Sequence, residues 1–347
     1  LTSPDSATIA DYKAKIREEY KYKQELKAFL TKPAKTTDGT EFKLYANIGT
    51  PEEADVALAE GADGIGLFRT EFLYMSTQAV SLHGAARSFS EQSQFEAYKS
   101  VLEKMGDKPV TIRTLDAGGD KIINAVDIPL VEEKNPLMGL RAVRLSLAYP
   151  QVFKTQIRAL YRASVYGNLR IMLPLISSVG QVDECLKIID EVKANLREEN
   201  IPFKEDVPVG IMIETAAAAV LSDCLAKRSD FFSLGTNDLT QYTLGIDREN
   251  QHVSSLYNEF SLAVLRLINL TVSNAIDANI PVSVCGEMAG RKDSIIVLAG
   301  MGIRHLSMSP KMISKTKEIL SRFSIEELEA ISAKHLNNHM DLIQNTD

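Results

Sequence analysis

The sequence has 347 residues, of which 45% are apolar and 24% are charged, and its formal net charge is −7. This is the composition of a globular protein with ample material for a core. The acidic balance argues against general binding to nucleic acid or to anionic membranes, and no apolar run reaches the roughly 18 residues of a membrane span. The three cysteines show no paired spacing, which favours a reducing, cytoplasmic compartment.

The N-terminal region predicts one long helix. Over residues 6–30, apolar side chains recur at helical spacing among lysines and glutamates. Pro33 and the Thr-Thr-Asp-Gly turn that follows it end this pattern. We therefore expect an N-terminal helical segment in residues 1–35, which the resemblance described below implies is a linker helix, and a second region in residues 36–347.

In this second region, strand-like segments alternate with helical patterns. Eight strands alternating with helices over about 270 residues predict an α/β fold of the (β/α)8 barrel type, whose usual size is about 250 residues. A doubly wound open sheet is the alternative, but Asn47-Ile-Gly-Thr50 is not a convincing phosphate loop after its first strand. The predicted strands are 42–48, 64–69, 109–115, 169–176, 207–214, 231–235, 281–286 and 305–308.

The most distinctive stretch follows the sixth predicted strand. Gly235 ends an apolar run, Asn237 and Asp238 come next, and Arg248 lies ten residues beyond Asp238. An amide, a carboxylate and a guanidinium just past a strand end suit a site for a metal and an anion. The alternative is that Asn237 and Asp238 only cap the next helix.

Other predicted strand ends also carry cations. The active site of a (β/α)8 barrel lies at the carboxyl ends of its strands. A surface ion pair is the ordinary role of any single cation there. Several cations converging in an acidic protein indicate an anionic ligand with several oxygens, because arginine binds phosphate and carboxylate bidentately. The cations expected at this edge are Arg69, Arg113, Lys121, Arg141 and Arg248.

Two carboxylates are expected beside these cations. Glu214 ends the fifth predicted strand and Asp238 follows the sixth, so the two would repel each other unless a cation lay between them. Two carboxylates with ligand oxygens and water suit Mg²⁺. The alternative is that both pair with the arginines and bind no metal.

Cys285 ends the seventh predicted strand. A free cysteine is most often a small buried apolar residue. At the mouth of a barrel that binds a metal and an anion, a thiol could instead transfer a proton. Residues 76–92 show no clear period after the second strand, and form either a loop over the barrel mouth or an ordinary surface loop.

Several motifs resemble the PEP-utilising enzyme family, in the same order and at matching spacing. Within it they are most similar to the enzyme I group of the bacterial sugar phosphotransferase system. The Gly-Gly-Asp-Lys that follows Asp116 favours this group over pyruvate phosphate dikinase and PEP synthase. The segments that carry the resemblance are 64–75, 114–121, 135–141, 231–243 and 284–290.

The resemblance implies a barrel that binds phosphoenolpyruvate (PEP) and Mg²⁺ and forms a homodimer. Glu214 and Asp238 match the Mg²⁺ ligands by motif position, and Cys285 matches the residue that protonates the enolate to give pyruvate. Arg113 and Arg141 are also expected to act in catalysis. The residues that match positions around the substrate are Arg69, Arg113, Lys121, Arg141, Asn237, Asp238 and Arg248.

The sequence also departs from the family. Enzyme I passes the phosphoryl group to a histidine in a Thr-Ser-His setting on an N-terminal domain, which meets the phosphocarrier protein. None of the five histidines here has that setting, so we expect a phosphotransferase domain without its acceptor. Ala216 stands where the family usually has proline. Two alternatives remain: a catalytically silent PEP sensor or dimerisation module, and a dikinase- or synthase-type domain, which would need a nucleotide-grasp domain.

Overall fold

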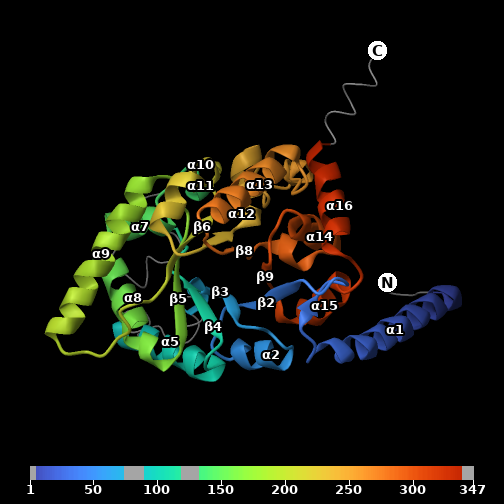
Figure 1. Ribbon diagram of the computed structural model, residues 1–347, viewed down its shortest axis with the longest axis horizontal. Coiled ribbons are helices and arrows are strands. Elements are labelled where there is room, and N and C mark those ends of the chain that lie inside the picture. The colour runs from blue at the N-terminus through green and yellow to red at the C-terminus, as the bar shows by residue number, and fades with distance from the viewer. Residues whose placement is uncertain (1–4, 74–89, 119–132, 338–347) are drawn as a thin grey trace, which may run out of the picture.

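A computed structural model describes residues 5–73, 90–118 and 133–337 of the chain. Its central feature is a closed ring of parallel strands surrounded by helices (Figure 1). Each strand from β2 to β9 pairs in parallel with the next, and β9 pairs with β2 to close the ring. The predicted (β/α)8 barrel is therefore confirmed, and the open sheet is excluded.

Every predicted strand segment overlaps one barrel strand. The sequence analysis missed β1 (Ala34–Lys35), which pairs antiparallel with β2 and is too short to show a period. The barrel strands are β2 (Glu41–Ile48), β3 (Ile65–Arg69), β4 (Pro109–Arg113), β5 (Asn168–Leu173), β6 (Val209–Ile213), β7 (Phe232–Leu234), β8 (Val282–Val284) and β9 (His305–Met308).

Helices cover the outside of the barrel (Figure 1). The helical pattern predicted over 216–227 divides into two short helices, because Leu221 leaves the helical region with ψ 12°. The α-helices are α1 (Ser6–Leu26), α2 (Glu53–Ala59), α5 (Glu91–Met105), α7 (Ala142–Ala148), α8 (Pro150–Ala163), α9 (Val179–Glu198), α10 (Ala216–Val220), α11 (Ser222–Leu225), α12 (Thr236–Leu244), α13 (Leu262–Asp277), α14 (Lys292–Gly300), α15 (Ile313–Leu320) and α16 (Ile325–Asn337).

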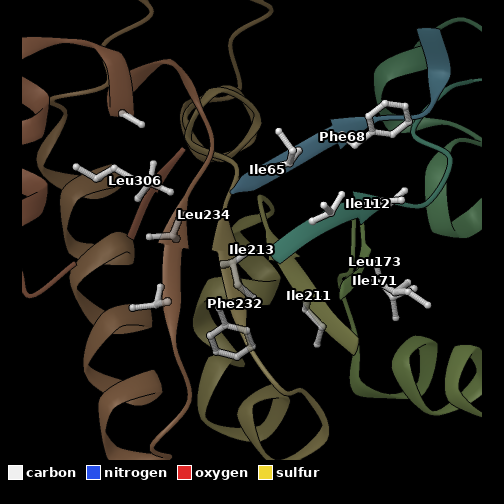
Figure 2. Packing of buried hydrophobic residues seen from close by; sticks show 14 of the residues in the cluster. Ile65, Phe68, Ile112, Ile171, Leu173, Ile211, Ile213, Phe232, Leu234 and Leu306 are labelled. Atoms are coloured by element: carbon white, nitrogen blue, oxygen red, sulfur yellow. The ribbon is translucent and has the colours of Figure 1, made fainter. Parts of the chain in front are cut away.

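The core lies between the strands and these helices, and strand alternation decides which side chains join it. On β6, Ile211 and Ile213 point outward with Phe232 and Leu234 of β7 (Figure 2). Met212, between the two isoleucines, belongs instead to a separate cluster that includes Cys285. Because successive side chains of a strand face opposite sides, the residue after Val284 turns into the barrel. Alternation thus places the Cys285 thiol inside the barrel.

The predicted N-terminal helix is present as α1, which extends away from the barrel (Figure 1). Tyr22 Oη donates a hydrogen bond to Glu318 Oε2 of α15 at 3.4 Å. The buried Lys317 Nζ donates to the carbonyls of Leu30 at 2.9 Å and Gly61 at 3.2 Å. These contacts join the end of the N-terminal segment to the barrel. Among the described helices, none has the length and apolar character to cross a membrane.

Ala216 is the first residue of α10, and this position accounts for the departure from the usual proline. Thr215 caps the helix, with its Oγ1 accepting from the Ala218 N–H at 3.0 Å. Proline is favoured at the first helical position, where the N–H has no partner within the helix. We expect Ala216→Pro to keep the fold and to raise the free energy of unfolding by up to about 1 kcal/mol in urea titrations.

The matched control is Ala218→Pro, which removes the N–H that donates a hydrogen bond to Thr215 Oγ1. We expect this substitution to lower the free energy of unfolding by about 3 kcal/mol. Equal losses in both variants would show that the backbone at Ala216 is incompatible with proline.

Candidate active site

A cavity of about 840 Å³ opens at the carboxyl ends of the barrel strands. This is the end at which barrel enzymes place their active sites, and the volume suits a small ligand. Lys121 lies outside the described residues. The other predicted site residues line this one cavity: Arg69, Arg113, Arg141, Glu214, Asn237, Asp238, Arg248 and Cys285.

Arg113, at the end of β4, is buried in the cavity wall between two carboxylates. Its Nη1 lies 2.7 Å from Asp116 Oδ2, and its Nη2 lies 2.6 Å from Glu71 Oε1. Burial disfavours the charged guanidinium, but Asp116 and Glu71 more than compensate and raise the pKa of Arg113 above its ordinary value. The Arg113 guanidinium therefore stays positively charged, and its two ion pairs fix its orientation.

Arg141 reaches the same place from the start of α7. Its Nη2 lies 3.0 Å from Asp116 Oδ1. Backbone contacts hold Arg141 next to the segment after β4. The Ala142 N–H donates to the Ala117 carbonyl at 3.2 Å, and Gly118 and Arg141 form an isolated antiparallel β-bridge. Ala142 has φ 50°, a conformation that costs a non-glycine residue energy, so the surrounding contacts hold the turn in place.

Both arginines keep donors to spare. Within the described part of the chain, Nε of Arg113 and Nε of Arg141 are buried and have no hydrogen-bond partner. A buried donor without a partner carries its full desolvation penalty. Both side chains also line the cavity, so an anionic ligand there could accept hydrogen bonds from the parts of the two guanidiniums that face it.

Three carboxylates gather beside the arginines. One oxygen from each of Asp116, Glu214 and Asp238 lies within 4.8 Å of the others. Burial raises the pKa of Glu214 well above its ordinary value, and repulsion from Asp116 and Asp238 adds to the shift. Burial and then Asp116 likewise raise the pKa of Asp238. A divalent cation would relieve this repulsion, and an all-oxygen donor set fits Mg²⁺.

The arginines do not take up both predicted metal ligands. Asp238 lies 3.6 Å from Arg248 Nη2, but among the described residues Glu214 forms no ion pair. Glu214 Oε1 instead accepts from the Leu175 N–H at 2.6 Å. The alternative in which both carboxylates are neutralised by arginines is therefore wrong for Glu214 in the described structure.

Asn237 and Asp238 lie in the first turn of α12 and do not cap it. The cap residue is Gly235, and no side chain makes a capping hydrogen bond. Asn237 Oδ1 instead accepts from the Glu287 N–H at 2.8 Å. This contact joins the segments after β7 and β8, and Gly286 permits it, because a Cβ there would collide with Thr236 Oγ1. The capping alternative is therefore wrong.

Cys285 lies inside the barrel and lines the cavity. Its residue is only 3% exposed, and burial raises the pKa of the thiol to about 11. Its N–H donates to the Leu234 carbonyl at 3.1 Å, and its own carbonyl accepts from Asn47 Nδ2 at 3.0 Å. These bonds hold the backbone of Cys285 in place, and the raised pKa favours the protonated thiol at neutral pH.

The sequence analysis gave no role to Glu71 or Asp116, the carboxylates that hold the arginines. Glu71 follows Arg69 by two residues, so its place at a strand end was a usable signal. Asp116 was visible too, but its partner Arg141 lies 25 positions away along the chain. Only the folded turn shows that the two meet.

Fold and cavity together define a class of protein: a (β/α)8 barrel whose mouth suits an anionic ligand with several oxygens and a divalent cation. The sequence model of the PEP-utilising enzyme PEP-binding domain matches residues 23–325. The chain therefore belongs to the PEP-utilising enzyme family.

Curated relatives agree with this assignment. A phosphoenolpyruvate-protein phosphotransferase from Priestia megaterium is 42% identical over 95% of this chain and 56% of its own length. Those from Streptococcus equinus and Bacillus subtilis are 43% and 41% identical, each over 97% of this chain and 57% of the relative. The chain thus spans a little over half of these proteins. A solved citrate lyase from Burkholderia xenovorans, with 16% identity and a TM-score of 0.45, is too distant to support an argument.

Proposed function

We propose that this chain is the PEP-binding domain of a phosphoenolpyruvate-protein phosphotransferase. It binds PEP with Mg²⁺, transfers the phosphoryl group to a histidine on another domain and releases pyruvate. The observation that carries the proposal is one cavity in which buried arginines with unpaired donors face three clustered carboxylates. Membership of the family and the names of the relatives support it.

PEP carries a phosphate and a carboxylate, and four arginine side chains line the cavity where these two anionic groups would bind. Phosphoryl transfer depends mainly on positioning and charge stabilisation. Arg113 and Arg141 would hold the phosphate through the parts of their guanidiniums that face the cavity. Arg69 and Arg248, which also line the cavity, would hold the remaining anionic groups, with Asn237 as a neutral donor.

Glu214 and Asp238 would hold Mg²⁺, which when bound supplies positive charge beside the phosphate and enolate oxygens. The phosphorus–oxygen bond of PEP breaks as the acceptor histidine nitrogen binds phosphorus. The enolate that remains takes a proton from the Cys285 thiol on its methylene carbon and becomes pyruvate. Arg113 favours the thiolate that this step leaves behind.

Further parts of the proposal rest on the resemblance. The acceptor histidine would belong to an N-terminal domain that follows the arrangement of enzyme I, and the phosphocarrier protein would meet that domain. Residues 1–35 would act as the linker, and 36–347 as the barrel and homodimerisation domain. The three unpaired cysteines favour the cytosol.

The residues of the cavity favour a catalytic function over that of a silent sensor. A sensor needs no acid, whereas Cys285 lines the cavity and burial raises the pKa of its thiol, which favours the protonated form. A dikinase- or synthase-type domain would share this chemistry and differ in the domains attached to it. Pyruvate formation with an enzyme I N-terminal domain added in trans would therefore support the phosphotransferase.

Calorimetric titration of PEP into the chain tests the proposal. We expect saturable binding in Mg²⁺ and at least about tenfold weaker binding in EDTA, because the carboxylate cluster needs a cation before an anion can bind beside it. Pyruvate in place of PEP serves as the control without a phosphate. Absence of PEP binding in both buffers would contradict the proposal.

A further inference from the structure

Asp116 joins the two arginines that we assign to the phosphate of PEP. Its side chain is 6% exposed, and its two oxygens are divided between them. Oδ2 lies 2.7 Å from Arg113 Nη1, and Oδ1 lies 3.0 Å from Arg141 Nη2. One carboxylate therefore links a residue at the end of β4 to a residue at the start of α7.

Asp116 also lies within 4.8 Å of oxygens of Glu214 and Asp238, which invites the view that it is a third metal ligand. Its surroundings argue against that view. Both of its oxygens already face a guanidinium, so a cation bound there would lie beside two positive charges. Mg²⁺ usually takes one or two protein carboxylates with water and phosphate oxygens, and Glu214 and Asp238 suffice.

We propose that Asp116 is a positioning residue: it holds Arg113 and Arg141 in the direction that receives the phosphate, and it does not bind the metal. An arginine side chain has many rotamers, and bidentate recognition of phosphate depends on a planar fork held at one angle. Both arginines line the cavity, with side chains 9% and 13% exposed, so part of each guanidinium is open to a ligand there. This inference rests on the proposed function, since it assigns a role within the same phosphate site.

The metal is tested first, with Mn²⁺ alone as the probe and electron paramagnetic resonance to count free ions. We expect Asp116→Asn to weaken Mn²⁺ binding by no more than about 5-fold, and Glu214→Gln to weaken it by about 50-fold or more. An Asp116→Asn loss as large as that of Glu214→Gln would overturn the assignment.

PEP is titrated next, at saturating Mg²⁺. We expect its affinity to fall at least about tenfold in Asp116→Asn, because asparagine keeps one acceptor oxygen and can hold only one of the two arginines. Pyruvate, which lacks the phosphate, should change by less than about threefold. A pure charge effect has the opposite sign, since removing a carboxylate beside an anion site strengthens anion binding. Unchanged or tighter PEP binding would therefore overturn the proposal.

A double-mutant cycle shows whether Asp116 acts through its partner. In an Arg141→Gln background, we expect Asp116→Asn to cost less PEP affinity than it costs in the wild-type chain, because one of the two held forks is already gone. Equal losses in both backgrounds would overturn the link to Arg141.

Nuclear magnetic resonance of arginine Nη–H groups separates this inference from the proposed function. We expect the Arg113 and Arg141 signals to be protected from solvent exchange in the wild-type chain and to lose protection in Asp116→Asn. A wild-type chain that fails to bind PEP would end the proposed function, whereas these signals would still decide whether Asp116 holds the arginines. Should Asp116→Asn fail to fold, Asp116→Glu keeps the charge, moves the carboxylate by one methylene and is expected to show the same loss of PEP affinity.

Discussion

Replacing Glu214 with glutamine is expected to abolish Mg²⁺-dependent binding of PEP while leaving the fold intact. The amide has the shape of the carboxylate and can still accept a hydrogen bond from the Leu175 N–H. This bond stabilises the backbone of Leu175, whose φ is 54°. It lacks the charge that a hard divalent cation requires. We expect PEP affinity in Mg²⁺ to fall about 100-fold or more in calorimetric titrations.

The same substitution should not lower the melting temperature in EDTA. Burial, Asp116 and Asp238 raise the pKa of Glu214 in the folded chain, so ionised Glu214 opposes folding at neutral pH. A neutral amide removes that opposition. A rise or no change in melting temperature, together with lost binding, would identify a site that gives up stability for function. Retained Mg²⁺-dependent binding would contradict the assignment of Glu214 as a ligand.

Glu259→Gln is the matched control. Glu259 is also buried, but it pairs with Arg291 at 2.8 Å and does not line the cavity. We expect this variant to keep PEP affinity within about twofold, because the charge that it removes acts on a surface arginine. A comparable loss in both variants would indicate a general effect of removing buried charge.

The barrel could be predicted from the sequence because its strands are short apolar runs at regular spacing. On β6, Ile211 and Ile213 face outward and Met212 faces inward, and all three are apolar. The strand therefore appears in the sequence as an uninterrupted apolar run. The two-residue β1 could not be found in this way, since its pairing with β2 depends on tertiary contact.

Much of the site could also be predicted, since strand ends of a barrel meet at one edge. Glu214 and Cys285 directly follow β6 and β8, Asp238 lies in the first turn of the helix after β7, and the barrel topology brings the three together. The link between Asp116 and Arg141 could not be predicted in this way, because it depends on how the chain returns between them. Local sequence thus reports which groups reach the mouth, and only the structure reports which groups pair there.

Replacing Cys285 with alanine is expected to separate binding from turnover. Cys285 is buried in the lining of the cavity, and the ion pairs of the arginines do not involve its thiol. We expect PEP affinity in Mg²⁺ to stay within about threefold, because no charge is lost. Pyruvate formation with the acceptor domain added in trans should fall by about 10² to 10⁴, the usual contribution of a positioned acid.

Proton transfer can also be followed in this chain without an acceptor domain. In the reverse of enolate protonation the Cys285 thiolate takes a methyl proton from pyruvate, so in deuterated water with Mg²⁺, at a pH that approaches the thiol pKa of about 11, the wild-type chain should incorporate deuterium into pyruvate. Cys285→Ala should not, whereas Cys224→Ser should match the wild type, because Cys224 does not line the cavity. Exchange that survives in Cys285→Ala would require a different acid.

The protonation state of Cys285 also determines how fast its thiol reacts with an alkylating reagent. Burial raises the thiol pKa from an ordinary 9.0 to about 11, so at pH 8 its thiolate fraction is roughly 100-fold below that of an unperturbed cysteine. In a Cys224→Ser background, we expect iodoacetamide to react with Cys285 at least that much more slowly than with glutathione, and the rate to climb with pH beyond 9. Rapid labelling at pH 7 would show a thiolate, which has no proton to give to an enolate.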